Sequence, residues 1–317
     1  MRVVEQTFDP ARGGDPSSGR SARKESLVGH QGRGFALLCA AMRNVDPETV
    51  AGFGVEWTHF DQAGVPPAEM RAHFEGYFRS FPWAGLPSKA VGFDAGCGSG
   101  RWARFVAEKV GTLHCVDASA EALAVARKNL AEQPNCAFHV ASVADMPLAE
   151  GSMDFGYSLG VLHHVPDTRA ALRACVSRLK RGAPFLLYLY YAFDNRAPWF
   201  RLLWRASDGV RRVISRMTPA PRVAVTTAIA ASIYWPLARL SRTAESLGAP
   251  VDSIPLSFYR RASFYTMRTD ALDRFGTRLE QRFTADEIRG MMEQAGLERI
   301  SFNDEAPFWC ALGYRAA

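Results

Sequence analysis

Three glycines that alternate with other residues stand between a short apolar run and a helical pattern. Residues 91–102 read V-G-F-D-A-G-C-G-S-G-R-W, with glycines at Gly96, Gly98 and Gly100. Glycine permits a tight turn and a close approach of ligand to backbone, and a helix N-terminus attracts carboxylate or phosphate. The dinucleotide fingerprint G-x-G-x-x-G would need Gly or Ala at position 101, where this chain has Arg101. The loop therefore predicts a small-molecule site with a different spacing.

Acidic residues end three successive apolar runs. Asp94 ends the first run, Asp117 closes L-H-C-V-D-A-S, and Asp145 follows the third run in V-A-S-V-A-D-M-P-L. A carboxylate at the second position can accept two hydrogen bonds from ribose hydroxyls, as it also does for NAD. An ionised carboxylate at the third position can only accept hydrogen bonds, so it pairs with an amine donor. The alternatives are a helix cap for Asp117, beside Ser119, and an ordinary turn before Pro147 for Asp145.

Two histidines follow the fourth apolar run, in M-D-F-G-Y-S-L-G-V-L-H-H-V-P-D. They are His163 and His164. Histidine titrates near neutral pH and can accept a proton from an attacking hydroxyl or amine. The sequence predicts that His164, at the mouth of the site, assists deprotonation. The alternative is that either histidine is satisfied by backbone groups and shapes the pocket.

The elements that position these residues belong to an ordinary globular chain. Its 317 residues are 48% hydrophobic and 22% charged, enough for two units or one large α/β domain. Six cysteines without a C-x-x-C pair indicate neither a disulfide framework nor a zinc site, which favours a reduced, cytoplasmic protein. The N-terminus lacks the apolar segment of a secretory signal. A net charge of +6 favours acidic or phosphate-bearing partners without requiring nucleic acid.

Hydrophobic periodicity divides the chain into four parts. Residues 1–34 form a flexible tail, 35–88 a helical N-terminal cap, 89–192 with 278–317 the core, and 193–277 an insertion. Short apolar runs alternate with helical stretches in the core, which predicts a doubly wound parallel sheet with crossover helices. The predicted strands are residues 90–95, 112–116, 137–141, 153–159, 184–190, 297–302 and 308–313.

The motif D-A-G-C-G-S-G resembles the first motif of class I S-adenosylmethionine-dependent methyltransferases, and later motifs follow in the family's order. The resemblance covers about residues 89–191 and 284–315. It implies a Rossmann-like sheet of seven strands with the last antiparallel, and S-adenosyl-L-methionine as cofactor. Asp94 would hold the cofactor's amino group directly or through water, Asp117 the ribose, and Asp145 the adenine amine. The implied cofactor residues are Asp94, Gly96, Cys97, Gly98, Gly100, Asp117, Ala118, Ser142, Val143, Asp145, Leu159, Gly160 and Trp57.

The cap carries a second, more local resemblance. F-G-V-E-W-T-H-F, residues 53–60, resembles a segment of bacterial methyltransferases associated with glycan and secondary-metabolite pathways. Trp57 would close over the cofactor or, alternatively, pack the cap onto the sheet.

The insertion opens with W-F-R-L-L-W-R, a basic amphipathic stretch that suits a substrate lid, a partner surface or a membrane surface. Its place after a strand that faces the cleft favours the lid, which would bury Trp199 and Trp204. The longest uncharged stretch, residues 223–238, is too short to span a bilayer. Candidate substrate contacts are Tyr190, Tyr191, Tyr259, Arg261, Tyr265 and Arg268.

These features predict in-line transfer of a methyl group to an oxygen or nitrogen of a small molecule, such as a glycan or secondary-metabolite intermediate. Alignment and water exclusion would supply most of the rate, without a metal. The alternatives are an NAD-dependent oxidoreductase, disfavoured by Arg101, and a non-catalytic protein that binds the cofactor and acts as a partner. The sequence leaves the acceptor and the oligomeric state open.

Overall fold

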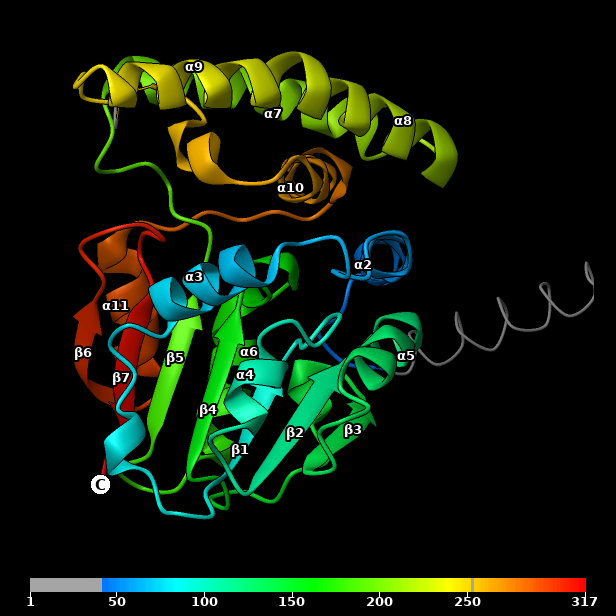
Figure 1. The fold of residues 1–317 in the computed structure, drawn as a ribbon. Coiled ribbons are helices and arrows are strands. Elements are labelled where there is room, and N and C mark those ends of the chain that lie inside the picture. Colours follow the sequence, from blue (N-terminus) through cyan, green and yellow to red (C-terminus); the bar gives the residue numbers. More distant parts are fainter. Residues whose placement is uncertain (1–41, 252–253) are drawn as a thin grey trace, which may run out of the picture. The chain divides into compact units, whose positions relative to one another are not determined.

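The computed structural model describes residues 42–251 and 254–317 (Figure 1). By its internal contacts the chain divides into residues 1–41 and residues 42–317, and the second unit contains every element described below. The predicted tail, residues 1–34, and the first residues of the predicted cap lie outside the described residues.

A seven-stranded sheet forms the centre of this unit, with strand order β3-β2-β1-β4-β5-β7-β6 (Figure 1). The strands are β1 Val91–Ala95, β2 Thr112–Asp117, β3 Cys136–Val140, β4 Phe155–Leu159, β5 Pro184–Tyr188, β6 Leu297–Phe302 and β7 Ala311–Arg315.

 The first five strands are parallel, while β7 runs antiparallel to both β5 and β6. The prediction of a doubly wound seven-stranded sheet with a reversed last strand is confirmed.

The last strand begins three residues later than predicted. The backbone N–H of Cys310 donates to Pro307, and the N–H of Asn303 donates to Cys310, so a turn occupies residues 307–310. Strand pairing with β5 starts only at Ala311, which lies opposite Leu187. The apolar residues at 308–310 follow the β pattern but pack in this turn, because backbone groups committed to a turn cannot join the ladder.

Helices cover both faces of the sheet. On one face lie α3 Pro67–Tyr77, α4 Ala103–Ala107 and α5 Ala120–Asn129, in a core that includes Phe74, Phe105 and Leu123. On the other lie α6 Thr168–Arg178 and α11 Ala285–Gln294, in a second core that includes Leu172 and Met291. Alternate residues of each strand point to opposite faces, so β1 sends Phe93 into the second core, while β4, Phe155–Leu159, sends Tyr157 into the first.

The helical cap lies at the carboxyl ends of the strands. Its helix α2, Pro47–His59, begins at Asp46, whose side chain accepts a hydrogen bond of 2.7 Å from the Thr49 N–H. The helix contacts α5 and also α10, Phe264–Gly276. Phe53 and Trp57 of α2 line the main pocket.

The insertion is almost entirely helical. It contains α7 Pro198–Ile214, α8 Pro219–Ile229, the π-helical segment Ala230–Tyr234, α9 Trp235–Ser246 and α10. Helix α10 contacts α7, α8 and the π-helical segment, and a small core unites Ile214, Ala230 and Met267 from these elements. Short 3₁₀ turns complete the unit, at Trp83–Gly85, Val143–Asp145, Leu162–His164 and Ser257–Arg261.

Helices α8 and α9 join through the π-helical segment into one helix, Pro219–Ser246. Its 28 residues are long and apolar enough, by length and composition, to cross a membrane, although the uncharged stretch alone is not. The helix is longer than the uncharged stretch because it also contains charged residues, including Arg222 and Arg239. The side chains of these two arginines donate hydrogen bonds to backbone carbonyls outside the helix.

Candidate active site

One large pocket, of about 720 Å³, lies at the carboxyl ends of the parallel strands. One half is lined by the glycine loop and the ends of β2 and β4, including Gly98, Asp117 and Leu159. The other half is lined by α10 and by the helices of the insertion, including Trp204 and Leu237. A volume of this size exceeds what one small metabolite fills, so the two halves can hold two reactants.

The glycine loop requires glycine at two positions. Gly96 has a φ of 85°, and a Cβ atom there would lie 2.4 Å from the side chain of Val161. Gly98 has a φ of 53°, and a Cβ atom there would lie 3.0 Å from the Trp57 ring. The loop thus leaves bare backbone facing the pocket, with Trp57 of the cap lying against it.

Asp117 ends β2 and faces the pocket. One of its carboxylate oxygens accepts the Gly98 N–H at 2.9 Å, and the other accepts the Ser119 N–H at 2.9 Å. Each oxygen keeps a further lone pair for a ligand. The side chain that caps α5 is that of Ser119, which accepts from the Ala122 N–H at 3.2 Å. Burial raises the pKa of Asp117, and its bonds from Ser119 and Gly98 oppose that rise.

Asp94 lies behind the glycine loop rather than on the pocket wall. Its side chain is 2% exposed, and burial raises its pKa to about 8. Its Oδ2 atom has no hydrogen-bond partner among the described residues. A side-chain hydrogen bond with Tyr157 opposes this rise in pKa, and the role of Asp94 at the amino group of the cofactor stays a prediction.

Asp145 departs from its predicted role. Its carboxylate accepts the backbone N–H of Arg43 at 2.8 Å and the Arg43 Nε–H at 2.6 Å, and the residue lies outside the pocket wall. Ser142 and Val143 do line the pocket, beside Ala118. The assignment of Asp145 to the adenine amine stays a prediction, and in the structure Arg43, a residue of the cap, pairs with this carboxylate.

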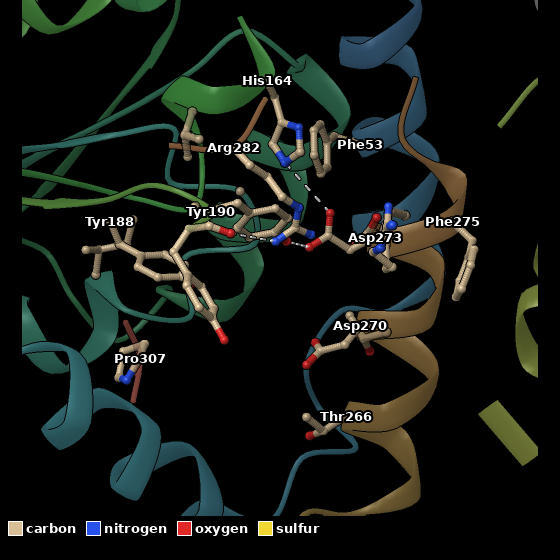
Figure 2. A pocket seen from close by; sticks show the side chains of 18 of the residues that line it. Phe53, His164, Tyr188, Tyr190, Thr266, Asp270, Asp273, Phe275, Arg282 and Pro307 are labelled. Atoms are coloured by element: carbon tan, nitrogen blue, oxygen red, sulfur yellow. Dashed lines mark hydrogen bonds and ion pairs between the residues drawn. The ribbon is translucent and has the colours of Figure 1, made fainter. Parts of the chain in front are cut away.

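Asp273 of α10 reaches across the pocket to the predicted base, His164 (Figure 2). The Nε2 atom of His164 lies 3.8 Å from Asp273 Oδ1. Its Nδ1 atom lies 2.7 Å from the carbonyl oxygen of Leu279, a geometry that fixes the proton on Nδ1. The Tyr190 hydroxyl donates to the other oxygen of Asp273. The Nε2 atom is buried and has no hydrogen-bond partner among the described residues.

His163 has a different environment. It is completely buried, its ring stacks on Tyr190 at 3.9 Å, and its Nδ1 accepts the Tyr190 N–H at 3.4 Å. Burial, with smaller contributions from His164 and Arg282, lowers its pKa well below the ordinary value. His163 is therefore a neutral residue behind the pocket wall, and the structure favours the pocket-shaping alternative for it.

The predicted substrate contacts fall into two groups. Tyr190, Tyr191 and Tyr259 line the pocket. The other three are engaged outside its wall: Arg261 pairs with Glu245 at 3.0 Å, the Tyr265 hydroxyl accepts the Gln62 N–H at 3.0 Å, and Arg268 lies over the Phe60 ring.

The second half of the pocket contains acidic groups that were not predicted from the sequence. Glu56 of α2 lines it. Asp270 and Asp273 of α10 also line it (Figure 2). Burial raises the pKa of Asp270 to about 6; it also raises the pKa of Glu56, with Asp273 as the next cause. The spacing of Thr266, Asp270 and Asp273 along one helical face was the available signal.

Arginines also line the pocket, among them Arg101 and Arg282. Arg282 donates to Glu280 at 2.9 Å, and its guanidinium lies 4.9 Å from the Tyr190 ring centre and 5.0 Å from that of Trp204. Arg101 lies over the rings of Trp57 and Trp102. Among the described residues, no group of three or more histidine, cysteine, aspartate or glutamate side chains could hold a metal ion.

The sheet order, the glycine loop and the carboxylate after β2 are features of the class I S-adenosylmethionine-dependent methyltransferase fold. Residues 93–187 match the family described as "Methyltransferase domain". The chain is 31% identical over 147 residues to a ubiquinone biosynthesis O-methyltransferase of Idiomarina loihiensis, covering 44% of this chain and 59% of that protein. It is 35% identical over 136 residues to the enzyme of the same name from Xanthomonas campestris, covering 42% and 55%. The chain thus spans less than two thirds of these relatives.

The chain is also similar to solved structures. A possible exported protein from Bordetella parapertussis is similar over 96% of this chain and 99% of its own, with a TM-score of 0.50 and 16% identity. A phosphoethanolamine N-methyltransferase of Haemonchus contortus, solved with S-adenosyl-L-methionine, matches 81% of this chain and 44% of its own, with a TM-score of 0.47 and 14% identity. At these identities the likeness concerns the fold alone.

Proposed function

We propose that this protein is an S-adenosylmethionine-dependent O-methyltransferase whose acceptor is a neutral hydroxyl on a largely apolar, ring-bearing molecule. The observation that carries the proposal is the unpartnered Nε2 atom of His164, which lies beside Asp273 where the two halves of one pocket meet. The family match favours S-adenosylmethionine over the dinucleotide alternative.

The cofactor half suits S-adenosylmethionine. Asp117 offers two lone pairs for ribose hydroxyls, the loop at Gly96 and Gly98 offers bare backbone, and Asp94 offers an unsatisfied buried carboxyl oxygen. When bound, the cofactor supplies a sulfonium methyl group that is already bonded to a good leaving group. The residues of the chain therefore have to align the acceptor, exclude water and remove one proton.

His164 and its neighbours are arranged to take that proton. The bond from Nδ1–H to the Leu279 carbonyl holds the ring in one tautomer, with the buried Nε2 atom toward Asp273. When Nε2 accepts the hydroxyl proton, the new positive charge faces the Asp273 carboxylate at 3.8 Å. Burial and then Asp273 raise the pKa of Tyr190, so its hydroxyl stays protonated and keeps orienting that carboxylate.

The second half of the pocket favours an apolar acceptor with few charges. Leu203, Ile233 and Leu237 line it together with several aromatic side chains. Burial raises the pKa values of the acids there, Glu56 and Asp270, and so favours their uncharged, hydrogen-bond-donating forms. The lining arginines Arg274 and Arg282 are already paired with Glu280. We therefore propose a neutral acceptor in place of the acidic or phosphate-bearing one that the net charge favours. The names of the curated relatives support oxygen as the nucleophile.

The test begins with binding. S-adenosylhomocysteine, but not NADH, should raise the thermal unfolding temperature, since only a ligand of the native state does so. The second step supplies S-adenosylmethionine and a catechol with an apolar chain and measures S-adenosylhomocysteine formation, with the chain-free catechol and the fully methylated ether as controls. Binding without turnover on any hydroxylated acceptor would favour the non-catalytic alternative. A shift with NADH alone would overturn the proposed cofactor. The proposal includes biosynthesis in the cytoplasm as the setting.

A further inference from the structure

Helix α7 exposes the face that amphipathic helices normally bury. Its apolar stripe consists of Trp199, Leu202, Leu203, Val210 and Val213, and all five side chains are exposed, with Leu202 at 68% and Val213 at 62%. The opposite side of α7 places Asp208 and Arg211 in the interior, where they form an ion pair of 2.6 Å. The prediction that a lid buries Trp199 is wrong, because this residue is 51% exposed. Trp204 turns inward and lines the pocket, as predicted for a lid.

The helix Pro219–Ser246 shows the same inversion. Only 22% of its most apolar 18-residue window is buried within the protein. Ile233, Trp235 and Leu240 are exposed, whereas the polar residues Arg222 and Ser241 are buried. Two neighbouring elements of the insertion therefore present apolar side chains to the surroundings. Monomeric proteins rarely leave contiguous apolar surface of this kind uncovered.

The same segment is strongly basic. Residues 198–246 contain eight arginines, no lysine and only two acidic residues. The acids are already paired, because Asp208 contacts Arg211 and Arg212, and Glu245 contacts Arg260 and Arg261. Exposed arginines such as Arg205 and Arg216 border the apolar stripe. Apolar side chains with tryptophan, bordered by arginine, match the interface of an anionic bilayer.

The pocket reaches this exposed face. Leu203 of α7 and Ile233 of the π-helical segment are exposed and also line the pocket. Apolar side chains of the insertion thus lead from the outer surface into the pocket. A molecule dissolved in a membrane could enter along this wall without crossing water.

We propose that the exposed apolar face of α7 and of helix Pro219–Ser246 docks on an anionic lipid bilayer and admits a membrane-dissolved acceptor to the pocket. The delivery of an acceptor rests on the proposed methyltransferase function, whereas the docking does not. The helix lies on the membrane and does not span it, because Arg222 donates to the Gly276 carbonyl and Arg239 to the Arg260 and Ala262 carbonyls. These bonds, and the packing on α10, hold its inner side in the protein.

A second copy of the chain fits this face less well than a bilayer. A two-fold dimer would place the basic segment of one protomer against that of the other. The exposed arginines would then approach like charges without the acidic partners that an interface needs. Anionic lipid headgroups supply those partners at the depth where the arginines border the apolar stripe.

Vesicle co-sedimentation of the full chain, without cofactor, tests the docking. We expect capture by phosphatidylglycerol-containing vesicles and at least about tenfold weaker capture by pure phosphatidylcholine vesicles. The double variant Leu202→Glu/Val213→Glu changes residues outside the pocket wall and should weaken capture at least about tenfold. Arg205→Gln/Arg216→Gln should remove most of the preference for anionic vesicles. The matched control Arg173→Gln/Arg181→Gln removes two exposed arginines elsewhere and should leave capture unchanged.

The outcomes separate the docking from the activity. No capture by anionic vesicles, or equal capture of the wild type and Leu202→Glu/Val213→Glu, overturns the docking. Self-association that the same variant abolishes, without vesicle capture, would assign the face to a second copy. If the docking is correct and the proposed function wrong, capture persists while no methyl transfer is found. Methyl transfer that is equally fast for membrane-dissolved and water-soluble acceptors, and unchanged in the variant, overturns the delivery alone.

Discussion

The substitution His164→Gln tests the proton transfer separately from folding and from cofactor binding. A glutamine amide can still donate to the Leu279 carbonyl, which lies 2.7 Å from Nδ1 in the wild type, so the local backbone keeps a partner. It cannot accept the acceptor's proton, because an amide is a very weak base. Position 164 also contacts Phe53, with ring centres 4.9 Å apart, and losing this ring contact costs about 0.5–1.5 kcal/mol of stability. The variant should therefore fold.

The expected effect follows from the role of a general base. Such a group contributes about 10²–10⁴ in rate, so turnover of His164→Gln should fall at least ~10²-fold, about 2.7 kcal/mol in activation free energy. Asp273→Asn should act through the same step. A charge pair at 3.8 Å is worth about 1–4 kcal/mol between the dielectric limits of water and a protein surface, which corresponds to roughly 5-fold to 10³-fold in turnover. Neither variant should change cofactor affinity appreciably.

The assay is S-adenosylhomocysteine formation at saturating acceptor, paired with calorimetric titration of the cofactor. His163→Gln is the matched control, because the neighbouring ring is buried behind the pocket wall and should affect stability more than turnover. Wild-type turnover in a folded His164→Gln protein would refute the role of His164. Equal losses of turnover in the two histidine variants would show that both histidines have a structural role.

Three further predictions concern the cofactor half. Asp117→Ala should weaken S-adenosylmethionine binding at least ~10-fold by calorimetry, because two charge-assisted hydrogen bonds are lost; unchanged affinity would place the ribose elsewhere. Gly96→Ala should destabilise the fold by at least about 1–2 kcal/mol in urea unfolding, since φ is 85° and Val161 lies 2.4 Å from the new Cβ. The pKa of Asp94 is about 8 in the folded protein, compared with an ordinary value of 3.8 for the unfolded chain. Between about pH 4 and 8 Asp94 is therefore ionised only in the unfolded state, and the stability of the fold falls as the pH rises. Asp94→Asn should remove this fall, of up to about 6 kcal/mol, and equal pH profiles would contradict the raised pKa.

The sequence by itself determined the sheet and the cofactor loop. Apolar runs of strand length, separated by helical stretches, are local patterns, and they predicted all seven strands. The loop was equally readable, because positive φ angles at Gly96 and Gly98 demand glycine whatever packs around them. Asp117 could be placed because it ends a predicted strand at the edge where parallel strands bind ligands.

Only the tertiary structure decided how the chain's distant parts share the pocket. Asp273 lies in the insertion and His164 in the core, and nothing in either segment specifies that the two side chains meet. Asp145 follows a strand as predicted, yet Arg43 of the cap takes its carboxylate. Local patterns cannot report such pairs, because the partner arrives by folding.

The insertion shows the same division most clearly. Its sequence specifies amphipathic helices, since the apolar residues of α7 recur at helical spacing. Periodicity identifies the two faces of a helix but not which of them is buried. In this protein α10 meets the polar face of α7, where Asp208 and Arg211 pair, and so leaves Leu202 and Val213 exposed. That choice depends on the shape and charge of the surface against which the helix packs, which exists only once the chain has folded.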